Sequence, residues 1–411
     1  MKNHERDTAV VSVQLRGPLY VHIPGFSASL ARQEYSNASI DYRFWLVRAL
    51  DQWMQQRRMP LDDFSEERIE HFLRHRWRCY SKQSADRPTL LSLLRQLQDS
   101  GVIQPHVIAP VISSLANLQA DFAQHLTEQR GLRPATVKQY LFHTHRFLTK
   151  RFGTGALSLA ELSTQDISRC LLCEARAVSP NAAQRMSVAL RSLFRFLHQR
   201  GDTATNLAES VPAVASWSLA GLPKYLSPQQ IECVLKACEH DGPVAQRDRT
   251  ILLLLARLGL RAGEVVHMTL DDINWEAGEL TVHGKGGRED KLPLPRDVGH
   301  SLAKYLRRVR PQCACRRVFI RSRAPHRGFA ESSAIVYIVR AALRRARINT
   351  VTGGAHLLRH ALATRMLRNG ASLPEIGEIL RHQLPKTTAI YTKVDMATLR
   401  TLAQPWPGGE A

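Results

Sequence analysis

The sequence predicts a mainly α-helical chain with one small antiparallel β-sheet near its C-terminal end. Apolar residues recur every three or four positions between residues 119 and 206, which is the spacing of helices that bury one face. Between residues 279 and 294, two runs of strand-forming residues flank a Gly-Lys-Gly-Gly turn, which is typical of a β-hairpin. Because 411 residues can bury more than one core, we expect three domains.

The first hundred residues repeat the pattern of the helical stretch that follows them. A two-residue slip between the first and last matches is easily accommodated in a loop. We therefore interpret residues 35–102 as a second copy of that domain, and the alternative is coincidence between two amphipathic bundles. The matches are Tyr42 with Tyr140, Leu50 with Leu148 and Ile69 with Ile167 at an offset of 98, then Leu97 with Leu197 and Gly101 with Gly201 at an offset of 100.

The predicted domain boundaries follow from these patterns. We expect a helical N-terminal domain at residues 1–112, a second helical domain at 113–208 and a linker at 209–225. The linker is rich in Pro, Ser, Gly and Ala, which argues against one long helix through it. The last domain, residues 226–411, opens with Ser227 before Pro228, which predicts a helix N-cap.

The last third of the chain contains side chains suited to attack on a phosphodiester by a tyrosine. Fixed guanidinium groups can hold the oxygens of a phosphate in the transition state, and a phenol needs a base or a cationic site before it becomes a nucleophile. We expect Arg261 and Arg359 to hold the phosphate, His356 to act as base and His382 to donate a hydrogen bond. The complete candidate set is Arg261, Lys285, His356, Arg359, His382 and Tyr391.

Local sequence supports these roles. His356 and Arg359 are three residues apart in a stretch, 356–367, with few helix breakers, so both should project from one helix face. Lys285 lies in the hairpin turn, from which a lysine can reach DNA and protonate a leaving oxygen. Taken singly, each residue has an ordinary explanation. Arg261, for example, lies in what looks like an apolar helical segment, 258–265, where arginines usually extend to solvent.

The ordered set, together with the strings Gly-Leu-Arg-Ala-Gly-Glu, His-Leu-Leu-Arg-His and Leu-Arg-His, resembles the catalytic domain of tyrosine recombinases, the phage integrase family. The resemblance implies the tyrosine recombinase fold, preceded by helical SAM-like DNA-binding domains, with Tyr391 as nucleophile. It also implies supporting roles for Glu264, which would brace Arg261, and for His360. The sequence departs from the family at Arg381, where the family usually has glycine.

Composition indicates an acidic polymer as partner. Lys and Arg number 57 against 36 Asp and Glu, a net charge of +21, as in proteins that bind nucleic acid through phosphates. No apolar stretch is long enough to span a bilayer, and no secretion signal is visible, so we expect a cytoplasmic protein associated with the nucleoid. Seven cysteines suggest reduced thiols rather than a disulfide framework. Cys170 and Cys173 have zinc spacing without a second pair, and we expect neither a metal nor any other cofactor.

The resemblance implies a site-specific DNA recombinase that cleaves and rejoins strands through a 3′-phosphotyrosine. It further implies double-stranded DNA with inverted-repeat core sites as substrate, a homotetramer on that DNA, and sister recombinases as further partners. Two alternatives stay open at this point. One is a nicking and closing enzyme like the type IB topoisomerases. The other is an architectural DNA-binding partner whose catalytic set is dispensable.

Overall fold

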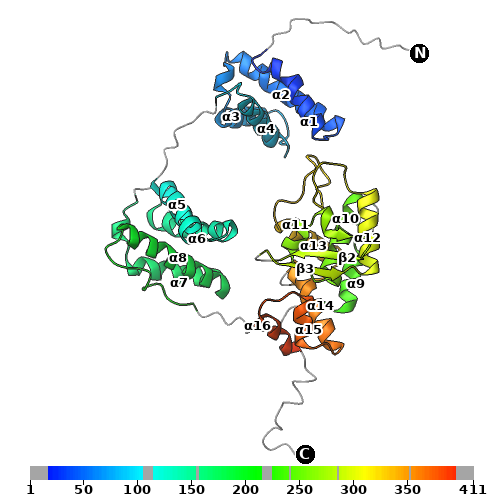
Figure 1. Cartoon of the computed structure of the whole chain (residues 1–411). Coiled ribbons are helices and arrows are strands. Elements are labelled where there is room, and N and C mark those ends of the chain that lie inside the picture. The colour runs from blue at the N-terminus through cyan, green and yellow to red at the C-terminus, as the bar shows by residue number, and fades with distance from the viewer. Residues whose placement is uncertain are drawn as a thin grey trace, which may run out of the picture. The chain divides into compact units, whose positions relative to one another are not determined.

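The computed structural model describes residues 17–104, 114–153, 157–214, 225–239, 242–284, 287–350 and 353–394 (Figure 1). Buried apolar side chains form separate cores in three stretches of the chain: residues 19–103, residues 118–211, and residues 226 onward. Within the described residues, no helix is long and apolar enough to cross a membrane.

The secondary structure elements in the described part of the N-terminal stretch are all helical. Leu46, Leu50, Ile69 and Leu93 are fully buried at its centre. A buried carboxylate, Asp51, accepts hydrogen bonds from the backbone N–H groups of residues 17 and 19 and so ties the start of the described chain to the helices. The elements are η1 (Tyr20–His22), α1 (Ile23–Arg32), α2 (Asn37–Gln56), η2 (Leu61–Asp63), α3 (Glu66–Arg76) and α4 (Asp86–Asp99).

The second stretch is also helical and packs α6 against α8, which bury Phe147 and Phe194 edge to face. Cys170 and Cys173, the pair with zinc spacing, lie on α7. The elements are α5 (Ser114–Gln124), the π-helix η3 (His125–Gln129), α6 (Pro134–Phe152), η4 (Leu159–Glu161), α7 (Thr164–Ala177) and α8 (Pro180–Arg200).

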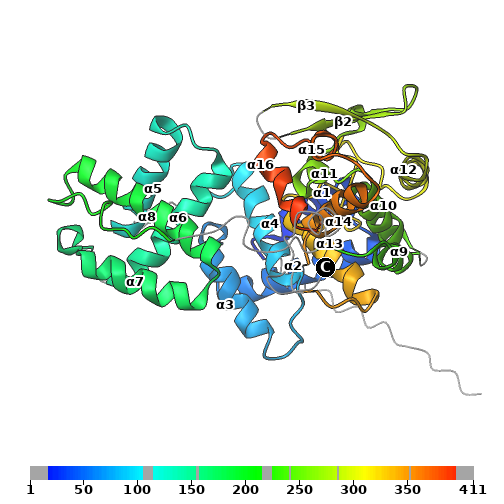
Figure 2. The same cartoon turned by 90° about the horizontal axis from the view of Figure 1, so that it is seen from below.

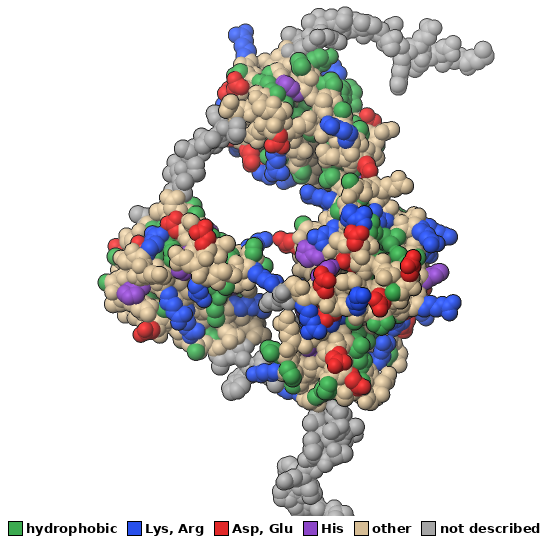
Figure 3. Space-filling model, viewed as in Figure 1, with side chains coloured by type: hydrophobic (Ala, Val, Ile, Leu, Met, Phe, Trp, Pro, Cys, Tyr) green, Lys and Arg blue, Asp and Glu red, His purple; other side chains and the backbone are tan. Residues whose placement is uncertain are grey.

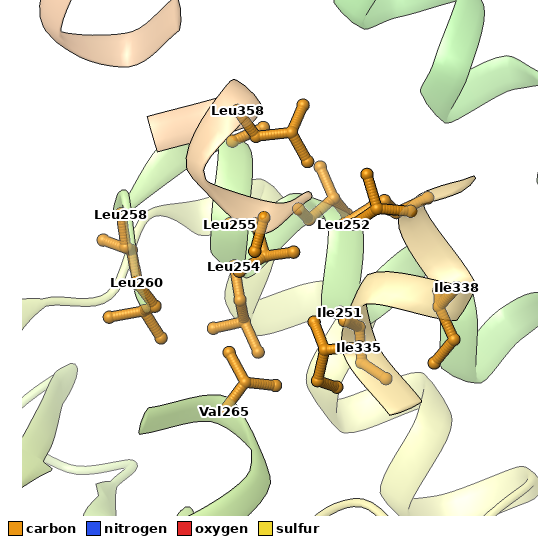
Figure 4. Close-up of a cluster of buried hydrophobic side chains, with 14 of the residues drawn as sticks. Ile251, Leu252, Leu254, Leu255, Leu258, Leu260, Val265, Ile335, Ile338 and Leu358 are labelled. Atoms are coloured by element: carbon orange, nitrogen blue, oxygen red, sulfur yellow. The ribbon is translucent and has the colours of Figure 1, made fainter. Parts of the chain in front are cut away.

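The third stretch combines helices with a sheet. Its central helix, α10 (Pro243–Arg257), buries every residue from Ile251 to Ala256 and contacts α9, α12, α13 and α14. Figure 4 shows side chains of α10 clustered with Ile335 and Ile338 of α13 and Leu358 of α14. The other helical elements are α9 (Pro228–Lys236), α11 (Ala262–His267), η5 (Leu270–Asp272), α12 (Arg296–Arg308), α13 (Ser333–Arg345), α14 (Ala355–Arg368), α15 (Leu373–Ile379), α16 (Pro385–Thr388) and η6 (Ala389–Val394).

The sheet is antiparallel and has the order β1 (Ile273–Asn274), β2 (Glu279–His283) and β3 (Glu289–Pro293). Leu280 pairs with Leu292, and both side chains enter the core. In Figure 2 the β2–β3 hairpin extends along the margin of the helical body. The predicted hairpin is therefore confirmed, and so is the mainly helical fold with a small antiparallel sheet. The two-residue strand β1 was not expected.

Three local predictions can be compared directly with the structure. Ser227 is the N-cap of α9 and forms a capping box with Gln230, as the Ser-Pro pair indicated. The helix expected over residues 356–367 is α14. The helical interpretation of residues 258–265 is wrong for residues 258–261, because α10 ends at Arg257 and Gly259 adopts a left-handed conformation with φ of 59°, while residues 262–265 lie in α11.

Candidate active site

Arg261 lies at a break between two helices rather than within one. It is the N-cap residue of α11, with extended backbone angles, and Glu264 in the first turn accepts from it twice. The Arg261 backbone N–H donates to Glu264 Oε2 at 2.8 Å, and its Nη1 donates to Oε1 at 2.7 Å. The brace between Glu264 and Arg261, which the family resemblance implied, is thus present in the geometry. About a third of the Arg261 side chain remains exposed.

Arg359 projects from α14 into the interior and is only 3% exposed. Its two terminal nitrogens donate to the carbonyl oxygens of Gly259 and Leu380. Because Arg261 Nη2 donates to the next carbonyl, that of Arg381, at 3.2 Å, two successive carbonyl groups hold the two arginines. A guanidinium carries five N–H groups, so both arginines keep donors for a phosphate.

The turn that supplies these carbonyls ends α15 in a Schellman motif. His382 N–H donates to the Gly377 carbonyl and Arg381 N–H to that of Glu378, both at 2.9 Å. Arg381 occupies the left-handed position of this motif, with φ of 56°, where glycine is normally favoured. This conformation gives a physical reason for the glycine expected there. The Arg381 side chain is buried, and its Nη2 donates to Glu264 Oε2 at 2.8 Å.

Tyr391 lies in η6 and is buried, with 1% of its surface exposed. It packs in an apolar cluster with residues of α14 and α15, and its hydroxyl lies 2.8 Å from His360 Nδ1. The ring of His382 lies parallel to the tyrosine ring, and His382 Nδ1 is 2.7 Å from the Thr388 hydroxyl. His356 stands one helical turn before His360, with 6.2 Å between the ring centroids.

Burial and the surrounding cations shift several pKa values in this cluster. Burial lowers the pKa of His360 to about 4, with His356 and Arg359 adding to the effect. Burial, followed by the charges of Arg359 and Arg261, lowers the pKa of His382 to about 4. Burial also raises the pKa of Tyr391 to about 12, against a smaller opposing effect of Arg359. The tyrosine is therefore protonated at neutral pH, and its hydroxyl shares a hydrogen bond with a neutral His360.

The pKa of Arg359 is also lowered. Burial, then Arg261 and Arg381, lowers its pKa to about 10, while Glu264 opposes the shift. His356 is partly exposed, yet its pKa is lowered by burial and by Arg359 and Arg261. An anion placed between these groups would relieve the repulsion, so the electrostatics favour a phosphate at this point.

A cavity of about 220 Å³ lies beside Arg261 and Arg381 and offers room for such an anion. Arg261 and His382 border it on one side, and Gly284 and Arg288 of the hairpin border it on the other. Lys285 itself lies outside the described residues. Gly284, which precedes it, lines the cavity, as does Arg288, which pairs with Asp290 through a 2.7 Å contact.

The structure thus brings five of the six candidate residues together: Arg261, His356, Arg359, His382 and Tyr391. One contact differs from the sequence-based expectation, because Tyr391 hydrogen-bonds His360, for which only a supporting role was expected, rather than His356. Thr388 and Arg288 were missed. The Thr-Thr pair just before Tyr391 was a usable signal for Thr388. Among the described residues, no group of three or more potential ligands could hold a metal ion.

Comparison with known proteins agrees with this geometry. The model of the phage integrase family matches residues 224–398, and that of the phage integrase N-terminal SAM-like domain matches residues 120–201. The chain is 39% identical over 394 residues to the integrase/recombinase y4rA of Sinorhizobium fredii, with 95% of each chain covered. The chain belongs to the phage integrase family. It is accordingly a tyrosine-type site-specific DNA recombinase, an enzyme that breaks and rejoins DNA strands.

Two further similarities define how far the relationship extends. The chain is 31% identical to the tyrosine recombinase XerD of Mycobacterium tuberculosis, an alignment that covers 98% of XerD but 72% of this chain. The solved post-cleavage complex of the XerH recombinase matches with a TM-score of 0.55 at 20% identity, covering 82% of this chain and 95% of XerH. The latter similarity supports the fold alone.

Proposed function

We propose that this recombinase cleaves duplex DNA through Tyr391, using Arg261, Arg359 and His382 to hold the scissile phosphate. The Tyr391 oxygen forms a bond to phosphorus, the bond from phosphorus to the 5′ oxygen breaks, and a 3′-phosphotyrosyl link results. His356 is the proposed base for the tyrosine proton, and Lys285 the proposed donor to the leaving 5′ oxygen. Attack by the partner strand's hydroxyl reverses the step.

One observation carries this proposal. Arg359 of α14 and Arg261, the N-cap residue of α11, are held by successive carbonyl groups of one turn, and Arg261 borders the cavity together with His382. Such preorganised donors stabilise charge that develops in a transition state without reorganising. The burial of Tyr391 means that it must leave its apolar cluster before it attacks, so the structure corresponds to a resting enzyme.

His360 supports the mechanism in this resting state. Its neutral imidazole is hydrogen-bonded to the Tyr391 hydroxyl and keeps the hydroxyl oriented within the cluster. The Tyr391 hydroxyl is hydrogen-bonded to His360 rather than to His356. If His356 is the base, this hydrogen bond must therefore break before His356 removes the tyrosine proton. Substitution of each histidine separately would distinguish a residue that stores the tyrosine from one that removes its proton.

The proposed substrate is duplex DNA with inverted-repeat core sites, and the proposed active assembly is a homotetramer that joins two duplexes. The XerH complex and a lambda integrase tetramer bound to a Holliday junction are structural relatives that support such an arrangement. The two helical domains and the catalytic domain, with the linker at residues 209–225, remain our proposed domain division. Sister recombinases as partners, a cytoplasmic location and association with the nucleoid also remain proposals.

Strand exchange between two labelled duplexes tests the proposed function. The duplex to be used is the one that the wild-type protein captures covalently from a library of nicked duplexes with a randomised core. A recombinase yields Holliday junctions and exchanged products from two duplexes. Relaxation of a supercoiled plasmid without exchange would favour the topoisomerase-like alternative, and binding without any covalent capture would favour an architectural role.

A further inference from the structure

The N-terminal domain reproduces the elements of the SAM-like domain at a nearly constant offset. The 3-10 turns η2 and η4 begin at residues 61 and 159, and α3 and α7 begin at residues 66 and 164, so both pairs are 98 residues apart. Each turn follows a long helix, α2 or α6, and each domain ends with another helix, α4 or α8. Shared composition and periodicity would explain the helices but not the equal spacing of the short turns.

The ends of the two domains repeat in atomic detail. Gly101 after α4 and Gly201 after α8 adopt left-handed conformations with φ of 70° and 80°. The next N–H in each domain donates back to an equivalent leucine carbonyl, at Leu97 with 3.0 Å and at Leu197 with 2.9 Å. Burial also repeats at the aligned positions. The buried pairs are Leu50 and Leu148, Ile69 and Ile167, Leu90 and Leu190, Leu93 and Leu193, and Leu97 and Leu197.

The two family models that match this chain do not cover this domain. The SAM-like model matches only residues 120–201, and the XerD alignment leaves more than a quarter of this chain uncovered. We propose that residues 17–104 are a second SAM-like domain that binds duplex DNA through a basic segment, residues 74–82, in addition to the contacts of the catalytic and SAM-like domains.

The basic segment lies where the two copies differ most. α3 ends at Arg76 and α4 begins at Asp86, whereas only two residues separate α7 from α8 in the other copy. The N-terminal copy therefore has a longer connection. The end of α3 and this connection, residues 71–85, contain no Asp or Glu. The cations of this stretch are Arg74, Arg76, Arg78 and Lys82.

Buried and stacked side chains hold this connection in shape. The fully buried carboxylate of Asp86 accepts from Trp77 Nε1 at 2.9 Å, from the Gln83 N–H at 3.2 Å and from the Tyr42 hydroxyl. Arg76 stacks over the ring of exposed Tyr80, and Lys82 stacks over Trp77. Cations held in fixed positions at a surface lose little entropy when they contact phosphates, so the segment suits a DNA backbone.

The positive charge of the basic segment, rather than the net charge of the whole domain, favours binding to DNA. Residues 17–104 contain 12 Lys and Arg against 10 Asp and Glu, so the domain as a whole is nearly neutral. Figure 3 shows acidic and basic side chains together on its viewed face. The competing partner for the basic segment is the acidic stretch Asp62–Glu70 of a second protomer. Glu66 and Glu70 already pair with Arg87 of the same chain, so the phosphate backbone is the better match.

Salt dependence of binding tests the proposal on the full-length protein. The loop variant replaces Arg74, Arg78 and Lys82 with Gln, and the control replaces Arg32, Arg58 and Arg68 of the same domain with Gln, so both variants carry three fewer positive charges. On a mixed-sequence duplex, the loop variant should bind more weakly, with a log–log salt slope shallower by about 0.9 for each phosphate that is no longer neutralised. The control should stay close to wild type. A loop variant whose slope equals that of the control overturns the proposal.

Crosslinking identifies the partner directly. Cys79 lies in the segment and is exposed, so in a background with Cys173 and Cys233 replaced by Ser it can carry an aryl azide. We expect irradiation to link Cys79 to the duplex. A link to a second protein chain would overturn the proposal and indicate that the segment contacts another protomer. The loop variant should still form the Tyr391 adduct at low salt. Absence of that adduct in wild type would count against the proposed function and leave the crosslinking result intact.

Discussion

At the residue scale, the site depends on the conformation of Arg381. Its left-handed backbone directs two successive carbonyls toward Arg359 and Arg261, and its own side chain donates to Glu264. A left-handed conformation costs a non-glycine residue ~1–2 kcal/mol. The buried ion pair with Glu264 offsets that cost, although Arg381 Nε has no hydrogen-bond partner among the described atoms.

Replacement of Arg381 with Gly should keep the turn but release Glu264 from its second partner. We expect single-turnover cleavage to fall roughly tenfold, since a hydrogen bond to a charged group contributes ~1.5 kcal/mol or more. Affinity for the captured duplex should remain unchanged. In a Glu264→Gln background the same substitution should have little further effect. An equal loss in both backgrounds would show that Arg381 does not act through Glu264.

Lys285→Ala tests the proposed proton donor. On an ordinary phosphodiester we expect slow cleavage, because the leaving 5′ oxygen lacks its proton. A substrate with sulfur at the 5′-bridging position should restore the rate, since a thiolate leaves without protonation. The same defect on both substrates would reduce Lys285 to a phosphate contact.

At the scale of secondary structure elements, the sequence predicts what depends on local pattern and misses what depends on packing. Helix α14, the hairpin and the cap at Ser227 follow from spacing, turn residues and capping chemistry. The sequence pattern places Arg261 in a helix because Leu258, Leu260 and Val265 are apolar and closely spaced. They are buried instead in the core around α10. The contact between Tyr391 and His360 joins η6 to α14, and no local pattern encodes it.

Gly259 permits the break that frees Arg261 from α10. A Cβ atom there would lie 2.7 Å from Leu380 Cδ2 and 3.0 Å from Leu362 Cδ2. Gly259→Ala should therefore lower the free energy of unfolding by ~1–2 kcal/mol for the left-handed conformation and by a further ~1–3 kcal/mol for overpacking. Gly278→Ala is the matched control, because φ there is 64° and no atom lies within 4 Å. If urea unfolding shows that both variants lose the same free energy of unfolding, the packing argument is disproved.

At the scale of the whole molecule, the histidines buried in the site make the free energy of unfolding depend on pH. Burial depresses the pKa values of both His360 and His382 to about 4, from an ordinary value of 6.5. Between these pH values the unfolded chain binds more protons than the folded one. The free energy of unfolding therefore rises with pH in this window and falls as the solution is acidified.

Local stability around α14 and η6 should consequently decrease as the pH is lowered from 6.5 toward 4. Hydrogen exchange of peptides from these elements, corrected for intrinsic rates, measures the effect. His360→Asn combined with His382→Asn should flatten the dependence, whereas His75→Asn in α3 should leave it unchanged. A dependence as steep in the double variant as in wild type would assign it to other groups.

The covalent adduct of Tyr391 tests the central claim most directly. On the captured nicked duplex, the wild-type protein should form a DNA adduct that resists denaturation, and proteolysis should map the DNA to the peptide that contains Tyr391. Tyr391→Phe removes only the hydroxyl and should bind the same duplex with wild-type affinity while forming no adduct. Adduct at wild-type levels in Tyr391→Phe would contradict the assignment of this residue as the nucleophile.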